Sequence, residues 1–145
     1  MESLLISACF LGINCKYDGG HNALPEEILD ALRARYRLVP ACPETAGGLP
    51  IPREPCERRG GSVCTRGGRD VSAEYDKGAA AALDLAQREG CRLALLKERS
   101  PSCCHEKIYD GSFTGKLVPG DGVTAEKLKQ AGIAVCGESE IQALL

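Results

Sequence analysis

The stretch LLISAC at residues 4–9 is a short apolar run that ends in a cysteine. Similar runs lie at residues 36–42, 92–97 and 133–136. Turn residues or segments with helical periodicity separate these runs, and this alternation is typical of parallel strands that helices bury on both faces. We therefore expect about four strands in one mainly parallel sheet.

The segments between and after these strands predict helices. The first helix begins at Pro25, and three more cover residues 72–89, 124–131 and 138–144. We expect Ser72 and Thr124 to cap the second and third helices, because a hydroxyl there can accept a hydrogen bond from the first turn. Right-handed crossovers then place helices on both faces of the sheet. The predicted fold class is α/β, a three-layer α/β/α sandwich with a Rossmann-like or flavodoxin-like sheet.

Two long segments, residues 43–71 and 98–123, are rich in turn-forming residues and lack a clear periodicity. We expect them to be loops, and loops of this length in compact domains are usually functional or disordered. No internal repeat, charge block or linker divides the chain. Residues 1–145 are therefore expected to form one domain.

The composition argues against several classes of partner. A net charge of -2 offers no basic footprint for duplex nucleic acid, whereas a small neutral or anionic substrate stays possible. No stretch approaches the roughly 18 apolar residues of a membrane span, and the N-terminus lacks the basic region of a signal peptide. We expect a cytoplasmic protein, and no feature indicates an obligate protein partner.

The nine cysteines are an odd number, and disulfides are rare in a reducing compartment. Cys9 and Cys42 close the first two predicted strands, and Cys103 lies just past the third. Ligands of open α/β sheets bind at the carboxyl ends of the strands, so these thiols and Cys15 in the first loop could converge. Three thiols with one open coordination position would form a metal or iron–sulfur centre.

The other five cysteines have no expected ligand role. Cys91 and Cys136 lie at or within strands, and we interpret them as small buried hydrophobes. Cys56 and Cys64 lie in a predicted loop and stay unassigned. Cys104 directly follows a candidate ligand, and because neighbouring side chains diverge we do not expect it to bind the same iron.

Polar residues next to the candidate thiols suggest catalytic groups. Glu44 follows Cys42 by two residues, and Pro43 restricts the backbone between them. Near a metal, this carboxylate could orient or deprotonate a water, although a salt-bridge role is an equal alternative. Ser100 and Ser102 lie in the loop after the third strand and could donate hydrogen bonds to a substrate or to cluster sulfur. Both serines are equally compatible with plain turn residues.

Three more residues are candidates for substrate contacts. Asp18 lies in YDGG at residues 17–20, which is first of all a turn signal. Gly48 lies in GGLPIPR at residues 47–53, where the backbone can approach a ligand closely. Arg53 ends this segment, and its planar guanidinium could hold an anionic or carbonyl group. The two histidines, each alone in a loop, are left out of the site.

These motifs together resemble the DUF523 family, whose characterised members are thiouracil desulfidases. The resemblance rests on SACFLG (7–12), NCKYDGG (14–20), CPE (42–44), GGLPIPR (47–53), SPSC (100–103), IYDG (108–111) and GVTA (122–125). It spans about residues 4–139 and has the shape of the short, stand-alone form of the family. Each motif alone is a weak signal, but jointly they are specific.

The resemblance implies a [4Fe–4S] cluster that three cysteines hold and whose fourth iron is open. Cys9 and Cys103 match family ligand positions. Some relatives carry a cysteine where this chain has glycines at 47–48, so the third ligand here is either Cys15 or Cys42.

The resemblance also implies a reaction, because Glu44 and Ser100 match positions regarded as catalytic in the family. The expected activity is a non-redox desulfidase that converts 2- or 4-thiouracil, or a close thiopyrimidine, to uracil and hydrogen sulfide. A thiolate-ligated iron is a soft partner for a thiocarbonyl sulfur, and Glu44 would help a water attack the ring carbon. Two alternatives are a zinc-dependent hydrolase or zinc-binding module and a thiol protein that handles persulfide or redox signals.

Overall fold

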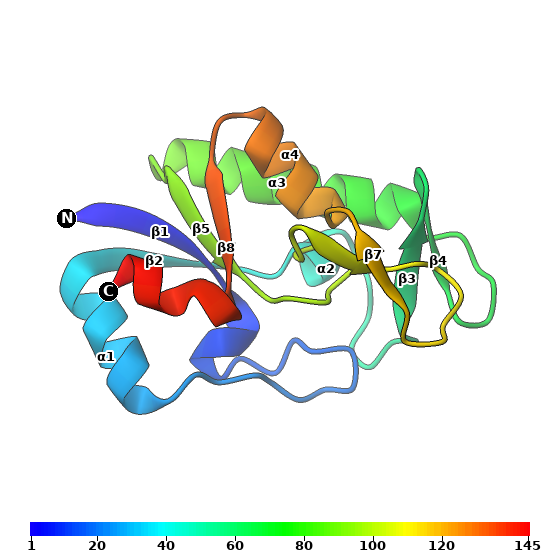
Figure 1. The fold of residues 1–145 in the computed structure, drawn as a ribbon, viewed down its shortest axis with the longest axis horizontal. Coiled ribbons are helices and arrows are strands. Elements are labelled where there is room, and N and C mark those ends of the chain that lie inside the picture. The colour runs from blue at the N-terminus through cyan, green and yellow to red at the C-terminus, as the bar shows by residue number, and fades with distance from the viewer.

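The computed structural model describes all 145 residues and contains one sheet of four strands (Figure 1). The strands are β1 (Glu2–Ser7), β2 (Tyr36–Ala41), β5 (Leu93–Leu96) and β8 (Ala134–Gly137). Their order is β2-β1-β5-β8, and every neighbouring pair is parallel. The predicted α/β fold with a four-stranded parallel sheet is confirmed.

Helices cover both faces of this sheet (Figure 1). They are α3 (Ser72–Arg88) and α4 (Val123–Gln130) on one face, and α1 (Glu26–Arg35) and the 3-10 helix η2 (Glu138–Leu144) on the other. Successive side chains of a strand point to opposite faces. In β1, Leu5 therefore packs in the core under α3 and α4, whereas Leu4 and Ile6 pack in the core with α1 and η2. The three predicted layers are present.

The strand order creates a crevice at the carboxyl ends of β1 and β5. The chain passes from β1 to β2 on one side and then returns across β1 to reach β5 on the other. Ligands of open α/β sheets bind where the strand order reverses in this way. The Ser7 hydroxyl at the end of β1 accepts a hydrogen bond from the backbone N–H of Lys97, just past β5, at 2.9 Å. This bond ties the two strand ends together at the crevice.

The two long segments predicted as loops contain regular structure, so that prediction is wrong. They hold α2 (Pro43–Ala46) and the hairpins of β3 (Cys56–Arg59) with β4 (Ser62–Thr65) and of β6 (Lys107–Tyr109) with β7 (Leu117–Pro119). The strands are only three or four residues long, and β3 is largely charged. The Glu57 carboxylate joins the hairpins, because it accepts the backbone N–H groups of Gly111 and Phe113 at 3.0 and 3.1 Å.

The helix starts differ from the predicted caps. The N-cap of α3 is Val71 rather than Ser72, and the carboxylate that accepts the Ser72 N–H at 2.8 Å belongs to Asp70. Helix α4 begins after Gly122, and no side chain caps it. The Thr124 hydroxyl is instead buried within 2.7 Å of the hydroxyl of Ser102. The long-range partner at Thr124 overrides its local capping preference.

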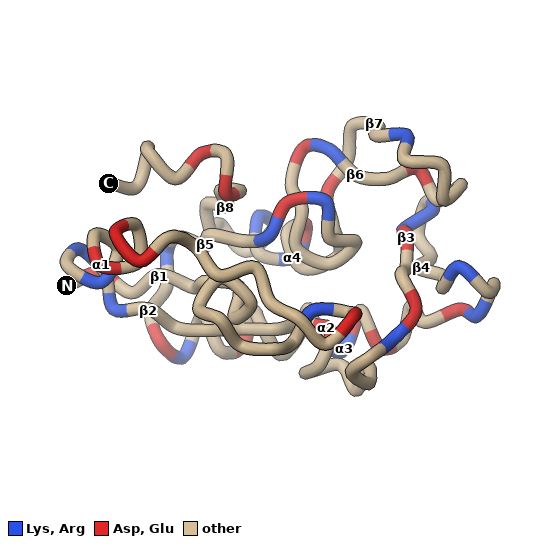
Figure 2. The backbone as a smooth tube through the Cα atoms, turned by 90° about the horizontal axis from the view of Figure 1, so that it is seen from below, with Lys and Arg blue, Asp and Glu red and all other residues tan.

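The charged residues are mixed rather than gathered by sign. Figure 2 shows Lys and Arg interspersed with Asp and Glu along the helices and hairpins, in keeping with the net charge of -2. Several ion pairs are exposed, such as Arg88 with Asp84 at 2.9 Å, and pairs of this kind contribute little to stability. None of the helices has the length and apolar character that a membrane span requires.

Two glycines allow α2 and α3 to touch backbone to backbone. A Cβ added to Gly78 in α3 would lie 1.9 Å from the carbonyl oxygen of Pro43, at the start of α2. A Cβ added to Gly47, just after α2, would lie 1.9 Å from the carbonyl oxygen of Glu74. Only glycine tolerates such an approach at both positions. The contact fixes α2, and with it the side chains that α2 presents to the crevice.

We expect Gly78→Ala to lower the free energy of unfolding by roughly 1–3 kcal/mol. Alanine is the better helix former by about 1 kcal/mol, but a Cβ cannot coexist with a carbonyl oxygen 1.9 Å away. Denaturant unfolding measures the difference. Gly61→Ala is the control, because its Cβ meets no atom within 4 Å. Equal stability of the two variants would show that the α2–α3 contact is not tight.

Candidate active site

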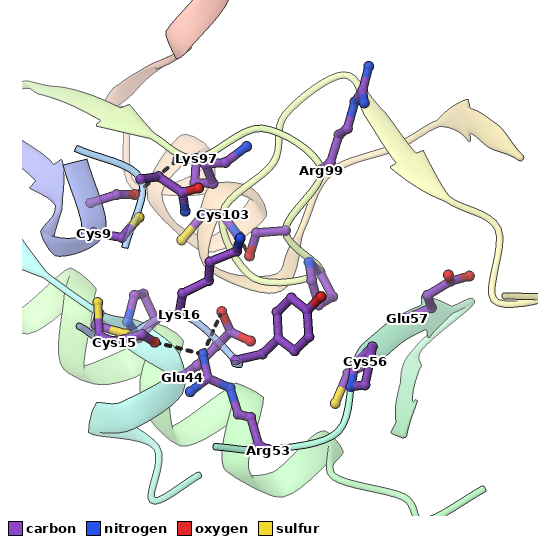
Figure 3. Close-up of a pocket in the computed structure, with 18 of the residues that line it drawn as sticks. Cys9, Cys15, Lys16, Glu44, Arg53, Cys56, Glu57, Lys97, Arg99 and Cys103 are labelled. Atoms are coloured by element: carbon purple, nitrogen blue, oxygen red, sulfur yellow. Dashed lines mark hydrogen bonds and ion pairs between the residues drawn. The ribbon is translucent and has the colours of Figure 1, made fainter. Parts of the chain in front are cut away.

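A cavity of about 550 Å³ lies at the carboxyl ends of β1, β2 and β5 (Figure 3). Its walls come from the 3-10 helix η1 (Ala8–Leu11) and the loop after it, from α2, and from the turn that follows β5. The two hairpins close its far side through β3 and the β6–β7 loop. The cavity therefore occupies the crevice that the sheet topology creates.

The four candidate thiols all line this cavity. Cys9 lies in η1, two residues after β1 ends, and Cys15 lies in the following loop. Cys42 directly follows β2 and is the N-cap of α2. Cys103 lies in the turn after β5. Three different strand ends thus contribute sulfur atoms to one space, although Cys9 does not itself close its strand.

These thiols perturb one another. Burial raises the pKa of Cys9, and the nearby Cys42 raises it further. Burial also raises the pKa of Cys103, with additional effects from Glu44, Cys42 and Cys9. The pKa of Cys15 rises to about 12, first through burial and then through Cys42. At neutral pH these three groups are therefore neutral thiols, and binding a metal as thiolates would release their protons.

Glu44 projects from the first turn of α2 and is held from two sides. Its Oε2 atom accepts a hydrogen bond of 2.6 Å from the Tyr75 hydroxyl of α3. Its Oε1 atom lies 3.6 Å from Nη2 of Arg53. The Glu44 side chain is 17% exposed and lines the cavity, so the carboxylate is oriented by the protein and still reachable by a small ligand.

Ser100 lines the cavity. Its hydroxyl oxygen accepts the backbone N–H groups of Ser102 and Cys103, both at 3.1 Å. Because the oxygen is occupied as an acceptor, the hydroxyl proton is left for another partner. The same two bonds hold the turn that carries Cys103.

Arg53 lines the cavity, but its guanidinium is engaged with the protein. Nη2 donates to the carbonyl oxygen of Cys15 at 3.0 Å, and Nη1 donates to that of Pro50 at 3.3 Å. The side chain is 5% exposed, and its buried Nε has no hydrogen-bond partner. Arg53 thus joins the loop of Cys15 to the carboxylate of Glu44.

Three of the predicted substrate contacts lie outside the cavity lining. The Asp18 carboxylate is exposed and accepts the backbone N–H of Gly20 at 2.9 Å, which closes a turn. Gly48 adopts a φ of +95° just after α2. Ser102 is fully buried, and its hydroxyl faces Thr124. In this structure these residues shape the loops around the cavity.

Several cavity residues were not assigned by the sequence analysis. They include Lys16, Cys56, Lys97, Tyr109 and Phe113. Figure 3 shows the side chain of Lys16 among those that line the cavity. Lys16 could have been predicted, because it directly follows the candidate ligand Cys15. Tyr109 and Phe113 could not, because they depend on a hairpin that the sequence did not predict.

Of the other five thiols, only Cys56 lines the cavity. Cys91 is buried in the core under α3 and α4, and Cys136 packs against the opposite core, as expected for structural cysteines. Cys104 is buried, but neither it nor Cys64 lines the cavity. No three His, Cys, Asp or Glu side chains in the chain are close enough to share a single metal ion.

The fold and the cavity define an α/β protein whose thiols and one oriented carboxylate meet at the carboxyl edge of a parallel sheet. A family model described as 2-thiouracil desulfurase matches residues 4–140, and the chain belongs to this family. The resemblance to DUF523 proteins is therefore confirmed.

Two relatives match nearly the whole chain. The "uncharacterized protein YbbK" of Bacillus subtilis (strain 168) is 41% identical over 152 residues, which cover 98% of this chain and 99% of that protein. The solved structure of the "[4Fe-4S]-dependent thiouracil desulfidase TudS" is similar with a TM-score of 0.94 and 46% identity. That comparison covers 99% of this chain and 95% of the TudS chain.

We expect Arg53→Met to lower the free energy of unfolding by about 2–3 kcal/mol, because it leaves the half-buried Glu44 without its cation and two carbonyl groups without a donor. Arg69→Met is the matched control. Its side chain is 75% exposed and forms a long ion pair of 3.8 Å with Glu74. Its replacement should therefore lower the free energy of unfolding by less than about 0.5 kcal/mol. Chemical denaturation of both variants tests this, and a loss at Arg53 no larger than at Arg69 would refute it.

Proposed function

We propose that this protein is an iron–sulfur-dependent thiouracil desulfidase. It replaces the sulfur of 2- or 4-thiouracil, or a close thiopyrimidine, with the oxygen of water. The products are uracil and hydrogen sulfide, so atoms balance and no external reductant is needed. The observation that carries the proposal is the meeting of thiols from three strand ends with an oriented carboxylate in one cavity. Membership of the family and the likeness to TudS support it.

The donor set fits a cluster. Cys42 raises the pKa of both Cys9 and Cys103, and Cys9 raises the pKa of Cys103, whereas Cys15 is not among the groups that shift either pKa. We therefore assign Cys9, Cys42 and Cys103 as ligands and place Cys15 beside them. Desolvated thiols that would repel one another as thiolates suit a cationic iron cluster, which accepts thiolates and offsets their charge. The cysteines are too far apart to share a single metal ion. This spacing suits a cluster, because each cysteine would bind a different iron.

Cys9, Cys42 and Cys103 would hold the [4Fe–4S] cluster, which when bound would supply an open iron as a Lewis acid for a thiocarbonyl sulfur. The chain's own residues supply the proton transfers. Glu44 accepts a proton from the attacking water, whose oxygen joins the ring carbon. Ser100 relays a proton to the ring or to the leaving sulfur and is reprotonated by the proton that Glu44 took from the water. Both water protons therefore leave as hydrogen sulfide, and no residue stays deprotonated.

The direct test is anaerobic purification followed by assay with 2-thiouracil. We expect brown protein with about four irons per chain and equal amounts of uracil and sulfide as products. Iron-free, colourless protein that releases no sulfide would overturn the proposal. Bound zinc without a visible absorption band would favour the hydrolase alternative. Reversible modification of Cys103 in metal-free protein would favour the thiol alternative.

Serine variants test the ligand assignment through bound iron. We expect Cys9→Ser, Cys42→Ser and Cys103→Ser each to lose most of the iron, because each removes one thiolate. Cys15→Ser should keep it, as should the control Cys64→Ser, whose half-buried thiol lies outside the cavity lining. Iron retained in Cys42→Ser and lost in Cys15→Ser would reverse the choice of third ligand.

Glu44→Gln should keep the cluster and lose turnover by roughly 10²–10⁴-fold, the usual contribution of a general base. The amide cannot accept the water proton but can still accept the hydrogen bond from Tyr75. Glu54→Gln is the control, because Glu54 is a second carboxylate in the same cavity wall. Steady-state sulfide release and visible absorption separate chemistry from cluster content. Equal activity of the two variants would remove Glu44 from the mechanism.

A further inference from the structure

Tyr75 touches the proposed base from outside the cavity. It is 1% exposed, does not line the cavity, and its hydroxyl donates to Oε2 of Glu44 at 2.6 Å. Burial raises the pKa of Tyr75, and the Glu44 carboxylate and Cys56 raise it further, so the hydroxyl stays protonated. The carboxylate therefore always faces a donor at this oxygen.

The ring of Tyr75 is held by side chains that lie outside α2. It packs in a small core with Leu49, Val63 and Val71, which come from the segment after α2, from β4 and from the start of α3. The packing of the ring therefore holds the Tyr75 hydroxyl in place where it donates to Glu44. A donor that is itself immobile can hold a carboxylate in one rotamer.

The glycine contact sets the distance between donor and acceptor. Gly78 lies one helical turn after Tyr75, and its backbone contacts Pro43, the residue before Glu44. Because the two backbones cannot move apart without losing this contact, Tyr75 and Glu44 face each other at fixed spacing. Arg53 approaches the other carboxylate oxygen, at 3.6 Å.

We propose that Tyr75 is a positioning residue that aims Glu44 at the attacking water, an inference that rests on the proposed function. A general base must lie within hydrogen-bond reach of the proton it removes, and small losses of alignment reduce the rate strongly. Without the hydroxyl, Oε2 loses its only protein donor and the carboxylate gains rotational freedom.

Tyr75→Phe keeps the ring and removes the hydroxyl, and with it the bond to Glu44 and the contact with the Cys56 thiol. We expect kcat to fall roughly 10-fold to 100-fold, with KM within about twofold of wild type. Iron content and visible absorption should not change. Tyr36→Phe is the matched control, because its hydroxyl bonds to the carbonyl oxygen of Leu144 at 2.8 Å away from the cavity. Unchanged kcat in Tyr75→Phe, or an equal loss in both variants, would overturn the proposal.

The double variant Tyr75→Phe/Glu44→Gln distinguishes positioning from a structural effect. If Tyr75 acts through Glu44, the double variant should be no slower than Glu44→Gln alone, whereas additive losses would refute the idea. A crystal structure of Tyr75→Phe should show a displaced or multiple Glu44 side chain, and an unmoved side chain would also refute it. Wild-type protein without desulfidase activity would overturn the proposed function itself.

Discussion

The whole site depends on the pairing of β1 with strands on both sides. Leu4, Leu5 and Ile6 are completely buried, so β1 is fixed in register by two cores at once. The Ser7 hydroxyl then locks its end to the residue after β5. Because the loops with Cys9 and Cys103 begin at these joined ends, the burial of three apolar side chains determines where the sulfur atoms start.

The sequence predicted the sheet because buried parallel strands are continuous apolar runs with clear ends. It missed the two hairpins for a physical reason. Strand β3 reads CERR, and its Glu57 carboxylate is stabilised by backbone N–H groups more than 50 positions away, at Gly111 and Phe113. The sequence around β3 does not indicate partners so far away in the chain. The same limit explains Thr124, whose hydroxyl meets Ser102 instead of capping its helix.

Within the site, the sequence predicted residues that directly follow strands better than residues that support them. Cys42 and Glu44 could be placed because the carboxyl ends of parallel strands share one edge. Tyr75 is buried, but its bond to Glu44 spans 31 positions and depends on the contact of α2 with α3, so the sequence around it does not indicate this bond. Gly78 inside a long helix indicates a close backbone contact, because an interior glycine is otherwise unfavourable in a helix.

Helix α2 carries two residues to which we assign different roles, and a longer loop would let them move separately. Its N-cap is Cys42 and its first turn carries Glu44, with Pro43 between them at a fixed φ. The ligand and the base that we propose lie on one rigid turn and therefore cannot be displaced independently. The backbone contact of α2 with α3 therefore sets the position of both groups at once. Binding a cluster at Cys42 would in turn stabilise α2 by mass action, and with it the alignment of Glu44.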